Sequence, residues 1–460
     1  MLNHKDNDQL DEVIEQWEES FEEKDEEREG GKRHVGVELK FPVVNHKGEA
    51  VSRETMQKLW EFLGTEGWDV ITDPYYKQPI GATLNGEPAE DLAGTETGYC
   101  KLELSLGYKE NLWYLQEKIK FLAELLENFR EQQGGGVYFL CYGMQPLTSP
   151  SDDLMTKKQR NLFWNKSFGN RRVNYFTVTC TNQVHVDVTT EETAAAVNVF
   201  NALSGMEVAL NANSNIWGGT VDREYKALSQ NLWHRWLPGN PRVGMTPRRF
   251  GSLTDYMIFI SGFKPVYVKR DKEYYGIGHY SSFAEYWAAA KKATGETENG
   301  ERVPLVPRDE DFDLHYTFCW NDARLSGYYT LENRVNCQQP PGRLLVPAAF
   351  TLGIMEKLLP AQSFVDTFEW EDLEEGREDA LRNGMQAHMA GERIKDICYE
   401  VLQIAEKGLQ KRGLGEEKLL QPLWESWENL RCPADEAEEV YLKEGIQKFL
   451  EKYSFARVLD

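Results

Sequence analysis

The sequence has few cysteines, and none of the seven forms a CxxC pair with another. A zinc site built on such pairs therefore has no support. Seven is an odd number in a chain of 460 residues, which fits reduced thiols better than a disulfide framework. We therefore expect a cytoplasmic protein with reduced cysteines.

Positive charge and long apolar runs are also scarce. Lysine and arginine number 52 against 75 aspartate and glutamate residues, so the net charge is −23. Such a chain repels phosphate backbones and anionic lipid surfaces, and we expect neither nucleic acid nor membrane as a main partner. No run of 18 apolar residues occurs, which predicts no membrane span. The opening MLNHKDNDQLDEV lacks the basic and apolar regions of a secretory signal, so none is expected.

Hydrophobic residues make up 41% of the chain, which is enough for a substantial core. Length alone suggests roughly two to four domains, although one large domain with helical additions is also allowed. Apolar residues at helical spacing predict a charged amphipathic helix that ends at Gly30-Gly31, and nearly continuous helix from about 345 onward. Further helices are expected at 54–66, 111–133 and 191–212, an exposed irregular insertion at 290–310, and helix breaks near Pro360, Gly413 and Pro433.

Four separated segments alternate polar and apolar side chains, as strands do. They are HVGVELKF, YCKLELS, FTVTCTNQVHVDV and YTLENRV, which begin at residues 34, 99, 176 and 329. An antiparallel sheet with one face in water would explain any one of them. However, the polar faces repeatedly carry glutamate, histidine, glutamine and arginine, among them Glu38, Glu103, His185 and Glu332. Carboxylates gathered on one face repel each other unless a cation is present, so the pattern suits a hard cation such as Mg²⁺.

At these residues the sequence resembles the type 2 glutamate–cysteine ligases and related carboxylate–amine ligases, which are relatives of glutamine synthetase. VGVELKF resembles a first-strand motif built on Gly-x-Glu-x-Glu, and ETGYCKLELS resembles a Glu-Pro-Gly turn followed by a Glu-Leu-Ser strand. TCTNQVHVDV and YYTLENRVNCQQP resemble the Gln-Val-x-x-Asp and Leu-Glu-x-Arg strands. The loop matches are YGMQPLTSPSDDLMTKKQR, NANSNIWGG and LWHRWLPGNPRVG. Seven motifs in the same order, over roughly 33–355, are fairly specific together.

The resemblance implies an α+β fold of the glutamine synthetase type. Its large antiparallel sheet would have a concave acidic face, with helices on the outer face and a helical C-terminal region. The implied domains are an acidic N-terminal helix or extension at 1–32, a catalytic domain at 33–355, and helices at 356–460 packed on that domain.

The resemblance also implies a reaction. A carboxylate substrate attacks the γ-phosphate of ATP, and an amine then displaces phosphate from the acyl phosphate to form an amide. Glutamate and cysteine are the default substrates, which would place the protein in glutathione biosynthesis. ATP and Mg²⁺ are the implied cofactors, amino acids and ATP are the implied partners, and the oligomeric state stays open.

The motif positions assign expected roles to particular residues. Glu38, His185 and Glu332 would hold one magnesium, with Glu103 and Glu96 serving another. The remaining expected roles are catalysis by Arg334 and Glu38, nucleotide binding by Gln183, Arg334 and Lys40, and substrate binding by Arg242, Arg235 and Tyr256.

One departure from the family pattern leaves alternatives open. The family usually has a second glutamate two residues after the first, and this chain has Lys40 there. The ammonium could substitute for a cation, or one metal site could be lost. The spacing from Glu96 to Glu103 is also one residue longer than usual. A ligase for another carboxylate and amine, and a non-catalytic binding protein on the same scaffold, are therefore alternatives. A metal-dependent hydrolase fits the motifs less well.

Overall fold

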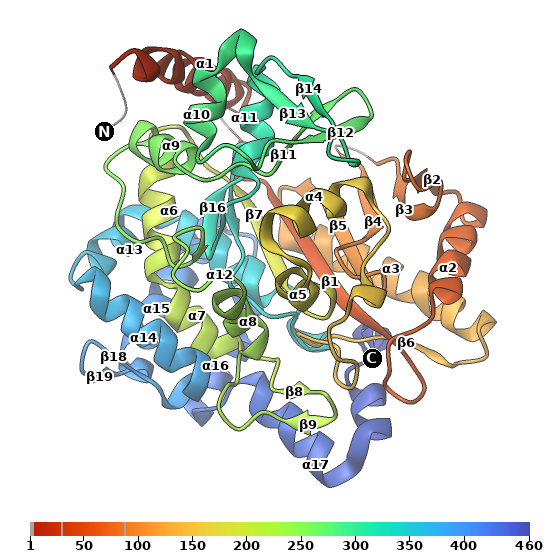
Figure 1. The fold of residues 1–460 in the computed structure, drawn as a ribbon. Coiled ribbons are helices and arrows are strands. Elements are labelled where there is room, and N and C mark those ends of the chain that lie inside the picture. The colour runs from red at the N-terminus through yellow and green to blue at the C-terminus, as the bar shows by residue number, and fades with distance from the viewer. Residues whose placement is uncertain (1–3, 29–30, 87–88) are drawn as a thin grey trace.

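A nine-stranded antiparallel sheet runs through the centre of the molecule (Figure 1). The computed structural model describes residues 4–28, 31–86 and 89–460. The strand order is β16-β17-β7-β1-β5-β4-β3-β2, and β6 pairs with the far part of β1. The large antiparallel sheet of the expected α+β fold is thus confirmed. The strands are β1 (Val35–Asn45), β2 (Asp69–Thr72), β3 (Pro79–Leu84), β4 (Asp91–Thr95), β5 (Lys101–Lys109), β6 (Val137–Phe139), β7 (Asn182–Asp187), β16 (Ala323–Leu325) and β17 (Thr330–Asn333).

Strand β1 lies between β5 and β7 and sets the register of the polar face. Glu38 pairs with Gln183 of β7 on one side and with Ser105 of β5 on the other. Lys40 pairs with Glu103. The opposite face of β1 is apolar and fully buried, and a slip of one residue would exchange the two faces, so burial fixes this register.

Helices cover the apolar side of the sheet. Helix α12 (Val346–Met355) is buried along its whole length and packs on β7 and β1, while α3 (Leu112–Gln132) packs on β5 and α2 (Arg53–Thr65) on β3. Helix α15 (Ile394–Arg412) crosses α12 so closely that a Cβ atom on Gly353 would overlap the Ala405 carbonyl oxygen. Other helices are α4 (Gln159–Phe168), α6 (Thr193–Ala202), α7 (Ser204–Asn211), α8 (Leu228–Trp236), α11 (Asp309–Tyr316), α13 (Leu358–Val365), α14 (Trp370–Asn383), α16 (Gln421–Asn429) and α17 (Pro433–Lys452).

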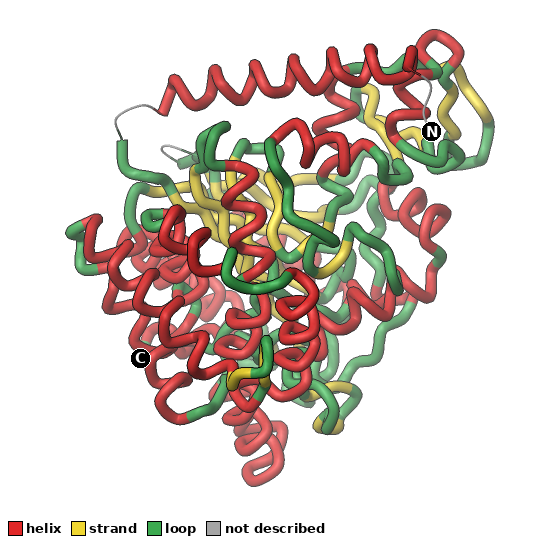
Figure 2. The backbone as a smooth tube through the Cα atoms, turned by 90° about the vertical axis from the view of Figure 1, so that its left-hand side faces the viewer, coloured by secondary structure: helices red, strands yellow, loops and turns green. Residues whose placement is uncertain are grey.

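The N-terminal helix, α1 (His4–Arg28), lies across one end of the molecule (Figure 2). It packs on α9 (Leu253–Ser261) and α10 (Phe283–Ala288). Trp17 is buried and donates from its indole nitrogen to Asp313 at 3.0 Å. The expected helix is therefore confirmed and docked, while its expected end at Gly30 lies outside the described residues.

Two expected features at the sheet margins are corrected by the structure. The strand expected from residue 176 begins only at Asn182. A 3-10 turn replaces its first part, because the Thr177 hydroxyl donates to the Asn174 carbonyl at 2.6 Å and favours a turn. The expectation that 290–310 is irregular was also wrong, since β13 (Thr294–Glu296) and β14 (Arg302–Pro304) lie there. They extend the hairpin of β11 (Tyr267–Arg270) and β12 (Glu273–Gly276), and strands of three residues are too short to show periodicity.

The C-terminal part is helical, as expected, and gathers on one side of the sheet (Figure 1). Gly413 ends α15 in the left-handed conformation and Pro433 begins α17. A helix break also lies near Pro360, as expected, because α12 ends at Met355 and α13 begins at Leu358. Pro360 itself lies in the first turn of α13, where proline is tolerated. The helix expected at 191–212 is divided into α6 and α7 at Leu203.

In the part of the chain that the structure describes, no single helix is long and apolar enough to cross a membrane. One bent pair, Pro341–Met355 with Leu358–Val365 at 89°, passes by length and composition. Its first member includes α12, which is buried against the central sheet.

Candidate active site

Three neighbouring strands bring Glu38, His185 and Glu332 together. One ligand atom of each lies within 4.8 Å of those of the other two. His185 pairs with Glu332 across β7 and β17, and its Nε2 lies 3.4 Å from Glu38 Oε1. A ring nitrogen and two carboxylates are a donor set that suits a divalent cation. These three residues were expected from the sequence to share one metal, and the structure places them together.

The His185 ring is oriented for such a ligand. Its Nδ1 lies 3.0 Å from the Thr330 hydroxyl, which in turn lies 2.7 Å from the Ser326 hydroxyl. Its Nε2 is buried without a hydrogen-bond partner among the described residues. A histidine held by one nitrogen, with the other facing a carboxylate, is a common arrangement at metal sites. The residues present therefore fit a bound cation.

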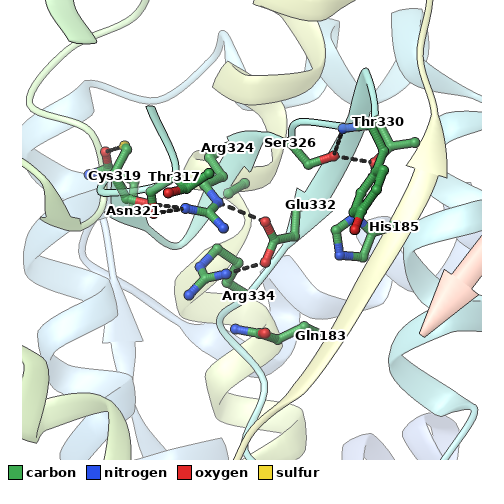
Figure 3. A network of polar contacts seen from close by, with 12 residues as sticks. Gln183, His185, Thr317, Cys319, Asn321, Arg324, Ser326, Thr330, Glu332 and Arg334 are labelled. Carbon is green, nitrogen blue, oxygen red and sulfur yellow. Dashed lines mark hydrogen bonds and ion pairs between the residues drawn. The ribbon is translucent and has the colours of Figure 1, made fainter. Parts of the chain in front are cut away.

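Two arginines hold Glu332 from the side away from His185 (Figure 3). Arg324 Nε donates to Oε2 at 2.7 Å, and Arg334 Nη1 donates to Oε1. Burial would raise the pKa of Glu332, but the charges of Arg324 and Arg334 hold that pKa well below its usual range. Glu332 is therefore ionised, and it connects the cation site to two guanidinium groups.

Lys40 occupies the neighbouring position on the same polar face. Its Nζ lies 2.5 Å from Gln183 Oε1 and 3.0 Å from Glu38 Oε2. It also lies 3.4 Å from Glu103 Oε2 and 3.6 Å from Glu96 Oε1. Burial would lower the pKa of this amine, but the glutamates around it raise the pKa instead, so Lys40 is a buried ammonium.

Glu96 and Glu103 form a coupled pair beside that ammonium. Burial raises the pKa of Glu103 to about 8 against the pull of Lys40, and the charge of Glu96 adds to the rise. Burial has the same tendency at Glu96, but Lys40 and a hydrogen bond with Glu103 hold its pKa well below the usual range. Of the two carboxyls, Glu103 is therefore the one whose protonation is favoured.

Sequence reasoning missed several cations of the site. Arg324 lies opposite Glu332 in the β16–β17 hairpin, and the Ser-Gly turn between two alternating segments could have indicated that pairing. Lys158 and Arg160 lie in the basic run KKQR, near Glu96 and Glu103. Burial, together with the charge of Arg160, lowers the pKa of Lys158 to about 8.

Lys158 is one of the residues that line a polar cleft of ≈ 580 Å³. Its walls also include the cations Arg53 and Lys157, the rings of Tyr76 and Tyr99, and two carboxylates, Asp152 and Asp153. Cationic and aromatic side chains in one cleft suit an anionic or nucleotide-like ligand.

The three residues expected to bind substrate contact other parts of the protein. Arg242 is 2% exposed, donates to the Lys264 carbonyl at 3.0 Å, and has its guanidinium carbon 4.8 Å from the centre of the Phe263 ring. Tyr256 is buried in the core against Phe250. Arg235 is exposed. The structure does not bring them into contact with the carboxylate cluster, and their roles stay predictions.

A buried carboxyl supports the site from behind. Glu207 of α7 accepts from Asn333 Nδ2 at 2.8 and 3.0 Å and from Asn336 Nδ2 at 2.8 Å. Asn333 follows Glu332 directly in the chain. Burial raises the pKa of Glu207 to about 7.

The free energy of unfolding is therefore expected to fall as the pH rises from 4.5, the ordinary pKa of Glu207, to about 7, its pKa in the folded protein. The folded state binds this proton more tightly, so the stabilisation is complete below 4.5 and is lost above about 7. Chemical unfolding gives the free energy of unfolding at about pH 5 and at about pH 8. Between these two pH values, that of the wild type should fall by up to about 3 kcal/mol more than that of Glu207→Gln. The exposed Glu54→Gln variant should follow wild type at both pH values. A difference between wild type and Glu207→Gln that does not change with pH would contradict the assignment.

The chain is similar to one described family along most of its length. The model of "Glutamate-cysteine ligase family 2(GCS2)" matches residues 34–451. The chloroplastic glutamate–cysteine ligase of Nicotiana tabacum is 26% identical over 321 residues, which are 66% of this chain and 58% of that protein. Glutamate–cysteine ligase A of Oryza sativa subsp. indica, also chloroplastic, is 28% identical over 298 residues, 61% of this chain and 56% of that protein. The chain thus spans less than two thirds of the length of these relatives.

Two solved structures share the fold. A glutamate–cysteine ligase from Francisella tularensis in complex with AMP aligns over 93% of this chain and 88% of its own, with a TM-score of 0.57 and 10% identity. A bifunctional glutathione synthetase from Pasteurella multocida aligns over 100% of this chain and 54% of its own, with a TM-score of 0.50 and 12% identity. At these identities the likeness concerns the arrangement of the chain.

Proposed function

Because the chain belongs to the glutamate–cysteine ligase family 2, we propose that it is an ATP-dependent carboxylate–amine ligase, with glutamate and cysteine as its first candidate substrates. The observation that carries the proposal is the group of Glu38, His185 and Glu332, with Arg334 and Arg324 bound to Glu332. Anionic ligands for a cation beside fixed guanidinium groups are the equipment of phosphoryl transfer.

The reaction proceeds in two steps. A carboxylate oxygen of the first substrate attacks the γ-phosphorus of ATP, the bond to the bridging oxygen breaks, and ADP leaves. The amine of the second substrate then attacks the acyl carbon, phosphate leaves with the bonding electrons, and the amine loses a proton to give the amide. The relatives named glutamate–cysteine ligases support glutamate as the carboxylate and cysteine as the amine.

Magnesium would be held by Glu38, His185 and Glu332, and it supplies charge neutralisation to the nucleotide phosphates when bound. Arg334 is fixed by Glu332 and borders a small cavity together with Gln183. We infer that its guanidinium contacts the transferring phosphoryl group. A concave form of the acidic face would enclose the reacting groups and keep water from the acyl phosphate.

The cations on the other side of the cluster suit the rest of the nucleotide or the substrate carboxylate. Lys158 faces both the Glu96–Glu103 pair and the polar cleft. The nucleotide in the Francisella tularensis structure supports ATP binding on this fold. Lys40, which replaces the second glutamate of the first-strand motif, favours one alternative: a divergent member of the family that joins another carboxylate and amine.

A direct assay tests the proposal. The purified protein is incubated with ATP, Mg²⁺ and glutamate, with cysteine or another amine from a panel, and phosphate release and amide product are measured. We expect release that depends on both the carboxylate and the amine, with γ-glutamylcysteine as product. Phosphate release with a different carboxylate–amine pair would support the ligase activity and change the assignment of its substrates. A protein that binds ATP but releases no phosphate with any pair would overturn the proposal.

A further inference from the structure

Lys40 Nζ occupies the position that a metal ion would take between four side-chain oxygens. Glu38, Gln183, Glu103 and Glu96 each direct an oxygen at it, at 3.0, 2.5, 3.4 and 3.6 Å. The residues come from three adjacent strands and the segment before β5, so the ammonium lies at their point of convergence. Its side chain is only 9% exposed, so solvent cannot easily compete for it.

The family resemblance assigns Glu96 and Glu103 to a second metal, and these two glutamates face the Lys40 ammonium. A magnesium ion requires oxygen ligands at about 2.1 Å in near-octahedral geometry. An ion placed between Glu96 and Glu103 would compete with Nζ for the same oxygens, and the two cations would repel each other strongly at such a distance. The residues around Lys40 therefore do not fit a second metal ion.

The two oxygens of Glu38 show how the ammonium and the remaining cation site fit together. Oε2 accepts from Lys40, while Oε1 faces His185 Nε2 at 3.4 Å. One carboxylate thus serves the ammonium with one oxygen and leaves the other for the group with His185 and Glu332. Lys40 thereby orients a predicted metal ligand without occupying its metal-facing oxygen.

We propose that Lys40 is a built-in substitute for one divalent cation, so that this chain binds a single metal ion, at Glu38, His185 and Glu332. The proposal rests on the proposed function only for the role of that ion in the ligase reaction. The number of bound ions can be measured without any turnover. A covalently attached ammonium is present at every metal concentration, so activity would need one ion from solution instead of two.

The number of bound ions is measured by titrating the full chain with Mn²⁺ and following free Mn²⁺ by electron paramagnetic resonance. We expect one Mn²⁺ per wild-type chain and two per chain in Lys40→Glu, which restores the carboxylate. Lys58→Met, a change at an exposed lysine of α2, should bind one. Two ions in wild type, or the same number in wild type and Lys40→Glu, would overturn the proposal.

A second variant tests the proposal even if Lys40→Glu does not fold. Lys40→Met removes the ammonium at similar size and leaves the glutamates without their cation. Its melting temperature in a chelator should fall below that of wild type, and added Mg²⁺ should raise it by about 3 °C more than it raises wild type. Equal responses to Mg²⁺ would count against the proposal. If the wild type shows no ligase activity but Lys40→Glu binds one ion more than the wild type, the ligase function alone is refuted. If the wild type is active and binds two ions, only the substitution of Lys40 for a cation is refuted.

Discussion

Replacing Glu332 with glutamine is expected to lower the turnover number of amide formation at least about a hundredfold, or about 3 kcal/mol of transition-state stabilisation. Glu332 is one of three groups that can hold a cation, and the other two lie on neighbouring strands. The amide of glutamine is neutral, so the site would lose a formal charge. Glutamine also directs an NH₂ group at Arg324 or Arg334, each of which now donates to a carboxylate oxygen.

The measurement separates chemistry from folding. Steady-state phosphate release gives the turnover number, near-ultraviolet circular dichroism and thermal melting report the fold, and Mn²⁺ titration reports the cation site. The matched control is Glu54→Gln, the same change at an exposed helical glutamate paired with one lysine. We expect the control to resemble wild type in all of these measurements. A folded Glu332→Gln protein with wild-type turnover would rule out the metal assignment.

The cluster itself could be predicted from local patterns. Alternation along β1, β7 and β17 places Glu38, His185 and Glu332 on polar faces, because side chains alternate strictly along a strand. Alternation does not say which strands are neighbours. That information came from the resemblance, and the observed order β17-β7-β1-β5 agrees with the grouping it implied.

The surroundings of the cluster could not be predicted in the same way. That Lys40 lies between four oxygens depends on the registers of β1 with β5 and with β7, which are non-local. Arg324 and Lys158 approach the cluster from a hairpin and a loop, where spacing carries little information about direction. The family resemblance assigned Arg242 to a substrate carboxylate or phosphate, and it carried no information about the packing among aromatic rings that buries this side chain.

Replacing Arg377 with methionine is expected to lower the free energy of unfolding by about 3 to 5 kcal/mol. Arg377 of α14 is 1% exposed and binds both oxygens of Asp322, with Nη2 to Oδ1 at 2.9 Å. It also contacts His234 Nε2 at 2.8 Å. Methionine would leave the Asp322 carboxylate buried without its cation, which costs far more than the pair itself contributes.

The effect should extend to the candidate active site, because Asp322 also supports the backbone there. Its carbonyl oxygen accepts from the Arg334 N–H at 2.7 Å, and its own N–H donates to the Gly244 carbonyl at 2.8 Å. Arg377 therefore ties the C-terminal helices to Arg334, which directly follows the strand that carries Glu332. Turnover should fall in Arg377→Met even at temperatures where the protein remains folded.

Two further variants decide whether the buried charge is the cause. Arg382→Met makes the same change on the same helix at a largely exposed ion pair with Glu224, and it should cost less than about 1 kcal/mol. Adding Asp322→Asn to Arg377→Met removes the stranded carboxylate, so the double variant should recover about 1 to 3 kcal/mol of the loss. Equal losses in Arg377→Met and Arg382→Met, or no recovery in the double variant, would contradict the assignment of the loss to the buried charge of Asp322.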